Sequence, residues 1–292
     1  MELSQILGGL TNQFAEAGIE SARADAEILV AHILGMSRGE LSVKAITGLE
    51  LSPSDVERIK YVADQRAERV PLQHLTGVAH FRNLELFVGP GVFVPRPETE
   101  GVAQVAIDAL KAQVARVAAG ETVIGVDLAT GSGAIALALA TEVPAAKVYA
   151  VELSEDALPW TRKNFAKYAN GLPNAPEVHQ GDLADAFADL NGQVNVLISN
   201  PPYIPNDMVP IYPEVVLHDP KLALYGGTDG LDLVRKVSQS GLRLVRPGGT
   251  IVVEHADIQS PAVIELLLAD GWKNVQPHLD FNQRPRCVSA TR

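Results

Sequence analysis

Residues 200–203 are Asn-Pro-Pro-Tyr, and they follow an apolar run at 194–198 that is typical of a buried strand. Two consecutive prolines cannot donate to a sheet ladder, so the strand must end before them. Asn200 is therefore expected at the carboxyl end of a strand, with Tyr203 close behind. The Asn200 side-chain oxygen and the Pro201 carbonyl can each accept one N–H of a planar NH2 group. This chemistry fits an acceptor nitrogen that carries two hydrogens.

A glycine-rich turn precedes this motif. Residues 126–134 are Val-Asp-Leu-Ala-Thr-Gly-Ser-Gly-Ala, the pattern of a strand, a tight turn and a helix start. Gly131 and Gly133 lack side chains, so a ligand can approach the backbone N–H groups at the helix N-terminus. The full dinucleotide pattern G-x-G-x-x-G is absent because residue 136 is alanine. On its own this turn is weak evidence for a nucleotide ligand.

Acidic residues end the next two predicted strands. Glu152 lies about 20 residues beyond the glycines, where an acid hydrogen-bonds ribose hydroxyls. Asp182 follows a strand at 177–180 and is expected to accept an adenine amino group, with Leu183 as an apolar wall. Together these strand ends favour a nucleoside-containing ligand, and NAD and S-adenosylmethionine both satisfy them. The Asn-Pro-Pro-Tyr motif favours S-adenosylmethionine.

Composition narrows the class of protein. The chain has 292 residues, 47% of them apolar, which supports a packed core and room for two domains. No apolar run approaches the roughly 20 residues of a membrane helix, and the N-terminus lacks a secretory signal pattern, so a cytoplasmic protein is expected. Cys287 is the single cysteine, which excludes an internal disulfide and a cysteine-based zinc site. The net charge of −11 argues against sequence-independent nucleic-acid binding.

The hydrophobic periodicity changes twice along the chain. Residues 1–74 show helical spacing, with a capping box predicted at Ser37 and Glu40. Residues 75–95 predict a β-hairpin connector with its turn at 89–91. From 96 to the end, strands alternate with helices, the pattern of a mostly parallel sheet. Strands are predicted at 122–128, 147–152, 177–180, 194–199, 250–255, 272–277 and 286–291, and helices at 134–141, 155–169, 230–245 and 260–269.

Taken together, these residues resemble an amino-directed class I methyltransferase that uses S-adenosylmethionine. More narrowly, the chain resembles the bacterial PrmC/HemK family of peptide chain release factor glutamine methyltransferases. The resemblance runs nearly end to end. It is carried by residues 71–77, 95–100 (Pro-Arg-Pro-Glu-Thr-Glu), 127–134, 199–204, 218–224, 248–249, 254–255 and 284–286.

The resemblance implies a Rossmann-like α/β fold with a seven-stranded, mostly parallel sheet behind a small helical bundle and a β-hairpin. The implied domains are a substrate-recognition domain at 1–74, a connector at 75–95 and a methyltransferase domain at 96–292. The implied reaction methylates the side-chain amide nitrogen of the glutamine in the Gly-Gly-Gln motif of class I release factors, in translation termination. S-adenosyl-L-methionine would leave as S-adenosyl-L-homocysteine, and neither a metal nor a membrane is expected. The protein is expected to be a monomer.

The resemblance also assigns site residues. Asn200, Pro201, Pro202 and Tyr203 are expected to bind the acceptor and support catalysis, and Asn200 also faces the cofactor. The methionine end of the cofactor is expected beneath Arg96, Glu98 and Thr99. The remaining cofactor-binding residues implied are Ala129, Thr130, Gly131, Ser132, Gly133, Glu152, Asp182 and Leu183.

Three positions depart from the usual family pattern. Ala129 replaces a common glycine, which is tolerable where its φ is negative. Glu152 replaces the commoner aspartate and should still reach both ribose hydroxyls. Gln283 precedes Arg284 where glycine is usual, so the conformation of that loop is open.

Other acceptors and functions compete with this interpretation. Asn200 could hold the amine of a flipped adenine or guanine, but that function predicts a basic groove and a recognition insertion, and residues 204–230 are short and not basic. A ribosomal-protein glutamine is another possible acceptor. A non-catalytic binding module with this fold is disfavoured by the intact motif and glycines. A dehydrogenase is disfavoured because no residue stands out as a hydride-transfer partner.

Overall fold

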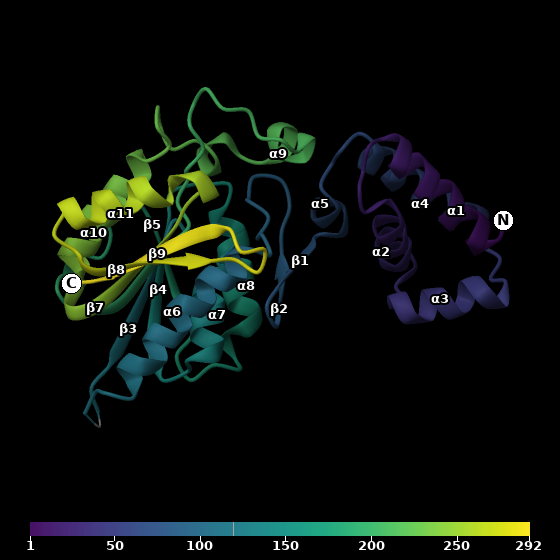
Figure 1. The fold of residues 1–292 in the computed structure, drawn as a ribbon. Coiled ribbons are helices and arrows are strands. Elements are labelled where there is room, and N and C mark those ends of the chain that lie inside the picture. The colour runs from purple at the N-terminus through teal and green to yellow at the C-terminus, as the bar shows by residue number, and fades with distance from the viewer. Residues whose placement is uncertain (119) are drawn as a thin grey trace. The chain divides into compact units, whose positions relative to one another are not determined.

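The computed structural model describes residues 1–118 and 120–292, which divide into two compact units. One unit is Met1–Val78 together with Pro210–His218, and the other is Ala79–Val209 together with Asp219–Arg292. The first unit is helical, and the second contains the large sheet (Figure 1). Among the described residues, no helix combines the length and apolar character needed to cross a bilayer.

The helical unit buries one apolar stripe from each of several short helices. Leu3, Phe14, Leu29 and Ile59 lie in its core and are almost fully buried. The predicted capping box is confirmed, because the Glu40 N–H donates to Ser37 Oγ at 3.2 Å and the Ser37 N–H donates to Glu40 Oε2 at 2.8 Å. The helices are α1 (Leu3–Glu16), α2 (Ala22–Leu34), α3 (Arg38–Thr47), α4 (Pro53–Ala67) and α5 (Leu72–Thr76).

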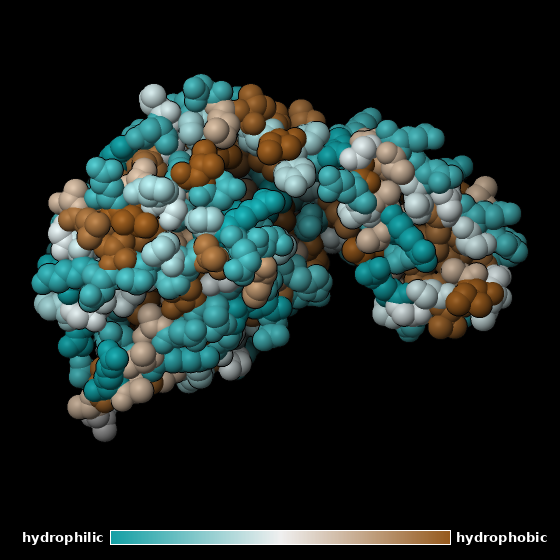
Figure 2. Space-filling view, viewed as in Figure 1, coloured by the Kyte–Doolittle hydropathy of each residue, from teal (hydrophilic) through white to brown (hydrophobic). Residues whose placement is uncertain are grey.

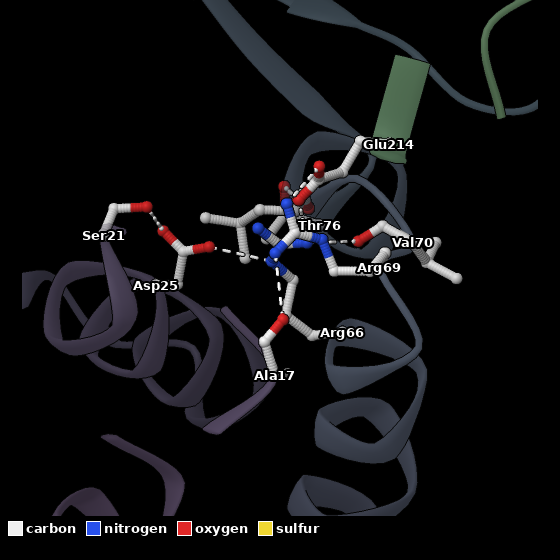
Figure 3. Close-up of polar contacts among 9 residues, drawn as sticks. Ala17, Ser21, Asp25, Arg66, Arg69, Val70, Thr76 and Glu214 are labelled. Atoms are coloured by element: carbon white, nitrogen blue, oxygen red, sulfur yellow. Dashed lines mark hydrogen bonds and ion pairs between the residues drawn. The ribbon is translucent and has the colours of Figure 1, made fainter. Parts of the chain in front are cut away.

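A segment from far along the chain completes this unit. Helix α9 (Pro213–His218) carries Glu214, whose carboxylate accepts from Arg66 at 2.9 Å and from Arg69 at 2.7 Å (Figure 3). Arg66 also donates to Asp25 at 2.8 Å, and both of these side chains are more than nine-tenths buried. A buried cation thus joins two carboxylates that are far apart in sequence.

The predicted hairpin is present, but its predicted turn is wrong. Strands β1 (Val78–Phe81) and β2 (Leu84–Phe87) are joined at Arg82, which has a left-handed φ of 53°. The Arg82 guanidinium holds this turn against the sheet domain by bonding Gln104 at 2.6 Å and pairing with Glu142.

Residues 89–91, where the turn was predicted, follow β2 and serve close packing instead. A Cβ atom on Gly89 would lie 2.5 Å from the Trp160 ring, and one on Gly91 would lie 2.8 Å from Asp156. The glycines are therefore required by a tertiary contact that the local pattern cannot reveal.

The large sheet has strand order β5-β4-β3-β6-β7-β9-β8. The first five strands pair in parallel, and β9 is antiparallel to both of its neighbours, which confirms the predicted Rossmann-like, mostly parallel class. Strands β3 and β6 are buried along their whole length, as expected for a sheet covered on both faces. The strands are β3 (Val123–Leu128), β4 (Ala146–Glu152), β5 (Glu177–Gln180), β6 (Val194–Ser199), β7 (Val245–Glu254), β8 (Lys273–Leu279) and β9 (Pro285–Thr291).

Helices cover the two faces of this sheet with separate cores (Figure 1). One core packs α6, α7 and the hairpin against one face, and the other packs α10 and α11 against the opposite face. The long helices of this unit are α6 (Thr99–Val114), α7 (Ala134–Glu142), α8 (Leu158–Ala169), α10 (Asp232–Leu244) and α11 (Ser260–Ala269). Short 3-10 turns are η1 (Ala188–Leu190), η2 (Lys221–Ala223) and η3 (Asp257–Gln259).

Two predicted boundaries need correction. Helix α8 begins at Leu158 rather than at 155, which places Pro159 in its first turn, where no hydrogen bond is lost. Strand β7 begins at Val245 rather than at 250, because Val245 pairs with Val194 before the ladder shifts register.

We expect Arg66→Leu to lower the free energy of unfolding of the helical unit by about 3–5 kcal/mol, because it leaves the buried Asp25 carboxylate without its cation and leaves Glu214 with Arg69 alone. Urea denaturation measures the loss. The matched control in the same helix is Arg58→Leu, which removes a solvent-accessible ion pair with Asp55 and an exposed hydrogen bond to the Ile33 carbonyl, and it should cost less than about 2 kcal/mol. Equal losses for the two variants would contradict this assignment.

Candidate active site

The loops that carry the predicted site residues leave the same edge of the sheet. Strand β3 pairs in parallel with β4 and β6, and Leu128 lies opposite both Val151 and Ser199. Glu152 lies opposite Gln180 on the neighbouring strand. Strand order reverses direction between β3 and β6, where open α/β sheets bind ligands.

The glycine turn after β3 is held from behind by α8. Thr161 Oγ1 donates to the Gly131 carbonyl at 2.6 Å, and Asn164 Nδ2 donates to the Ser132 carbonyl at 2.9 Å. Gly133 has a φ of 83°, and a Cβ atom there would lie 2.6 Å from Phe165. Gly131 also has a positive φ, but a Cβ atom there would meet nothing within 4 Å, so this part of the turn faces open space. The turn therefore forms a backbone cradle open on one side.

Asp127 fixes the turn to its strand and helix. Its Oδ2 accepts from Thr130 Oγ1 at 2.5 Å and from the Ala136 N–H at 3.2 Å. Asp127 is fully buried, and burial raises the pKa of its carboxyl to about 7. The sequence interpretation did not select Asp127, although it is the acid within the glycine pattern itself.

Ala129 corrects an expectation. Its φ is +59°, not negative, so the alanine occupies the left-handed conformation that glycine adopts at little cost. Gln283 is similar: with a φ of 61° it turns the loop so that Asp280 Oδ1 accepts the Asn282 and Arg284 N–H groups at 2.8 and 3.0 Å. Ala129 and Gln283 thus both carry a Cβ atom in a backbone conformation that favours glycine.

Glu152 lies beside the glycine turn as its spacing predicts. Its Oε2 accepts from the Gly131 N–H at 2.7 Å, and its Oε1 accepts from the Ser154 N–H at 2.8 Å. Burial raises the pKa of this carboxyl. Each oxygen keeps a second lone pair, so the group can also accept from hydroxyl groups of a ligand.

The third strand end is more open. Asp182 is half-buried, its Oδ1 accepts from the Ala184 N–H at 2.9 Å, and Lys236 lies 3.8 Å from its Oδ2. Leu183 is 94% buried and belongs to the core shared with α10 and α11. A ligand can therefore reach the Asp182 carboxylate more readily than the Leu183 side chain.

Asn200 follows β6 directly, and its side chain points toward the start of α6. Its Nδ2 donates to Thr99 Oγ1 at 3.4 Å, and Thr99 Oγ1 donates to Glu254 Oε1 at 3.1 Å. Thr99 and Glu254 are 4% and 1% exposed. Burial raises the pKa of Glu254 to about 8, with Thr99 and Arg286 acting in the opposite direction.

Pro201 is buried, whereas Pro202 and Tyr203 are half-buried. The Tyr203 carbonyl accepts from Gln259 Nε2 at 2.9 Å. Burial and the nearby Glu254 carboxylate raise the pKa of the Tyr203 hydroxyl. The Tyr203 hydroxyl is therefore close enough to Glu254 to feel its charge.

Arg96 is fixed by a residue that the sequence interpretation did not include in the site. Its Nη2 lies 2.5 Å from Asp219 Oδ2, and its guanidinium carbon lies 4.8 Å from the centre of the Phe93 ring. Burial raises the pKa of Asp219 to about 6, although Arg96 acts in the opposite direction. Glu98 caps no backbone group at the start of α6. The family-like segment 218–224 was the available signal for Asp219.

The sheet order, the glycine cradle and the acids at adjacent strand ends define a Rossmann-like class I methyltransferase. Within the part of the chain that the structure describes, no group of three His, Cys, Asp or Glu side chains has the geometry to hold a metal ion.

Comparisons with known proteins specify the family. Residues 5–77 match the model described as the PrmC N-terminal domain, and residues 83–211 match the model of the methyltransferase small domain. The release factor glutamine methyltransferase of Streptomyces coelicolor (strain ATCC BAA-471 / A3(2) / M145) is 49% identical over 97% of this chain and 95% of that protein. The 4-amino-L-phenylalanine/4-methylamino-L-phenylalanine methyltransferase of Streptomyces pristinaespiralis is 37% identical over 99% of this chain and 95% of that protein.

A solved structure supports the fold alone. The hMettl16 catalytic domain in complex with the MAT2A 3′UTR hairpin 6 is 14% identical, with a TM-score of 0.54 over 79% of this chain and 81% of that one. The chain belongs to the release factor glutamine methyltransferase family, and it is an enzyme that transfers methyl groups. The resemblance predicted from the sequence is confirmed.

We expect Ala129→Gly to raise the free energy of unfolding by about 0.5–1 kcal/mol. Relief of the left-handed alanine gains about 1–2 kcal/mol, and the more flexible unfolded chain offsets part of that gain. Urea unfolding measures the difference. Ala138→Gly, in the middle of α7, is the control and should instead lose about 1 kcal/mol or more. A loss for Ala129→Gly would show that its Cβ contacts outweigh the backbone strain.

Proposed function

We propose that this enzyme transfers a methyl group from S-adenosyl-L-methionine to the side-chain amide nitrogen of the glutamine in the Gly-Gly-Gln motif of class I release factors. The observation that carries methyl transfer to a planar nitrogen is the position of Asn200 at the strand end beside the glycine cradle. The glutamine acceptor is supported by the relative that is 49% identical over nearly the whole of both chains.

The residues present fit the proposed cofactor. The cradle of residues 129–133 has open space at Gly131, and the Glu152 carboxylate beside it has free lone pairs for ribose hydroxyls. Asp182 is exposed enough to accept from an adenine amino group. Arg96 and Glu98 lie just before α6, and Thr99, its first residue, bonds to Asn200. When bound, the cofactor would supply a sulfonium methyl group. S-adenosyl-L-homocysteine is the expected product, and we propose no metal.

The nitrogen of the acceptor amide is a poor nucleophile because its lone pair is delocalised into the carbonyl group. The Asn200 side-chain oxygen and the Pro201 carbonyl would each accept one N–H bond, which orients the nitrogen and accommodates the positive charge that develops on it. The Tyr203 ring would pack on the planar amide, and Pro202 stiffens the backbone between them. The proton is proposed to leave after methyl transfer.

The helical unit is proposed to bind the release factor. Figure 2 shows apolar side chains at its surface over α3 and α9. Val43 and Ile46 on α3 are 59% and 86% exposed, and Ile211 and Leu217 near α9 are 92% and 63% exposed. Exposed apolar residues that gather on one surface are typical of protein-binding sites. We propose that the protein works in the cytoplasm as a monomer.

Three other acceptors would be detected by the experiment described below. The 37% identical relative is named for a 4-aminophenylalanine, whose amine is also a planar nitrogen with two hydrogens, so a free arylamine is a second candidate. A base amine of RNA is the third, and the net charge of −11 disfavours it. A glutamine of a ribosomal protein is the fourth.

The decisive experiment supplies labelled S-adenosylmethionine with a mixture of release factor, ribosomal proteins, RNA and 4-aminophenylalanine. Mass spectrometry then locates the label. Label on the Gly-Gly-Gln glutamine supports the proposal, and label on any other acceptor alone overturns it. A release factor with Gln replaced by Glu in that motif should remain unlabelled.

We expect Asn200→Ala to lower kcat by at least about 10²–10³-fold, because one of two groups that orient the acceptor is lost. Binding of S-adenosylmethionine, measured by calorimetry, should persist with at most a modest loss. The control Asn206→Ala changes an exposed asparagine six residues on and should leave kcat unchanged. Unchanged transfer by Asn200→Ala would remove Asn200 from the mechanism.

A further inference from the structure

We propose that Thr99 and Glu254 are positioning residues that fix which end of the Asn200 side-chain amide faces the acceptor. The proposal rests on the role given above to Asn200. It assigns Thr99 to the orientation of the acceptor site rather than to the methionine end of the cofactor, and it gives a role to the Glu-His motif at 254–255, which the proposed function leaves unused.

Three separate elements bring together a chain of hydrogen bonds that runs from Asn200 through Thr99 to Glu254. We call this chain the relay. Asn200 follows β6, Glu254 ends the neighbouring strand β7, and Ser199 pairs with Val253 immediately before them. Thr99 is the first residue of α6. The hydrogen bonds run from Asn200 Nδ2 to Thr99 Oγ1 at 3.4 Å, and from Thr99 Oγ1 to Glu254 Oε1 at 3.1 Å. Because Thr99 and Glu254 are 4% and 1% exposed, bulk water does not compete for these bonds.

Counting protons gives the relay its direction. A threonine hydroxyl has one proton, and a carboxylate oxygen can only accept. Once Thr99 donates to Glu254, its oxygen can only accept from Asn200, so the NH2 end of Asn200 must point toward Thr99. The Asn200 oxygen then points away, free to accept an N–H of the acceptor. With the amide turned by 180°, its NH2 group would face the NH2 group of the acceptor, and no hydrogen bond could form.

Surrounding groups act on the charge of the Glu254 carboxyl in opposite directions. Arg286 attracts it, the Tyr203 hydroxyl also favours its charged form, and Glu98 repels it. If a proton is held on Oε2, Oε1 is a carbonyl oxygen that still accepts from Thr99. The relay therefore keeps its direction when Glu254 is charged and when Oε2 carries the proton.

The first test compares three variants of the full-length enzyme. Thr99→Val removes the hydroxyl at nearly constant volume and should lower kcat about 10–100-fold, while the KM for the acceptor and calorimetric binding of S-adenosylmethionine stay within about two-fold. Thr99→Ser restores the hydroxyl and should recover kcat to within about three-fold of wild type. Thr141→Val, which removes a hydroxyl that bonds only to carbonyls within α7, should leave kcat unchanged.

The second test is a double-mutant cycle. Glu254→Leu should lower kcat as far as Thr99→Val does, and the double variant should be no slower than Thr99→Val alone, because the two residues act through one chain of hydrogen bonds. Glu254→Gln keeps an acceptor oxygen, should lose less than Glu254→Leu, and serves as the test if the leucine variant does not fold.

The outcomes separate this proposal from the proposed function. If wild type methylates another acceptor, the proposed function fails, and the variants are then compared on that acceptor. The relay is overturned by unchanged kcat in Thr99→Val, by a loss that appears mainly in cofactor binding, by failure of Thr99→Ser to recover activity, or by additive losses in the cycle. A loss in Glu254→Gln as large as that in Thr99→Val would also overturn it, because Glu254 would then act through its charge.

Discussion

Parallel pairing of β4, β3, β6 and β7 is the constraint on which the site depends. A parallel ladder aligns the carboxyl ends of neighbouring strands, so the glycine turn, Glu152, Asn200 and Glu254 emerge at one edge although they are far apart in sequence. Both faces of these strands are covered by helices, so the register is fixed by buried side chains. The packed core therefore sets the spacing of the groups that we assign to methyl transfer.

Buried polar groups connect that core to the loops. Asp127 joins β3 to the glycine turn and to α7, and Glu254 joins β7 to α6 and, through Thr99, to Asn200. Burying a carboxyl group is costly, as the raised pKa values of both acids show. Each of the two acids accepts hydrogen bonds from its partners, and we propose that the bonds at Glu254 turn the Asn200 oxygen toward an acceptor. Buried charges also connect elements of the helical unit, where Arg66 forms ion pairs with both Asp25 and Glu214.

Local patterns predicted most elements because the central strands β3 and β6 are mostly apolar runs and because α3 and α4 begin at the serine caps Ser37 and Ser52. The wrong predictions have a common cause, because each concerns a residue whose backbone conformation or spacing is set by tertiary contacts. The hairpin turns at Arg82 rather than at the glycines of 89–91, which are needed for contacts with Trp160 and Asp156. Likewise, Ala129 has a positive φ that its residue type disfavours, and only the packing around the turn imposes it.

The sequence by itself determined the fold class, the family, the glycine turn and the Asn-Pro-Pro-Tyr strand end, because these depend on residue type and short-range spacing. Only the tertiary structure showed that Asn200 is hydrogen-bonded to Thr99 and Thr99 to Glu254. It also showed that Asp219 pairs with Arg96 and that Glu214 belongs to the helical unit. Each of these hydrogen bonds joins residues more than a hundred positions apart in sequence. Hydrogen bonds between such residues depend on strand order and register, which no local pattern records.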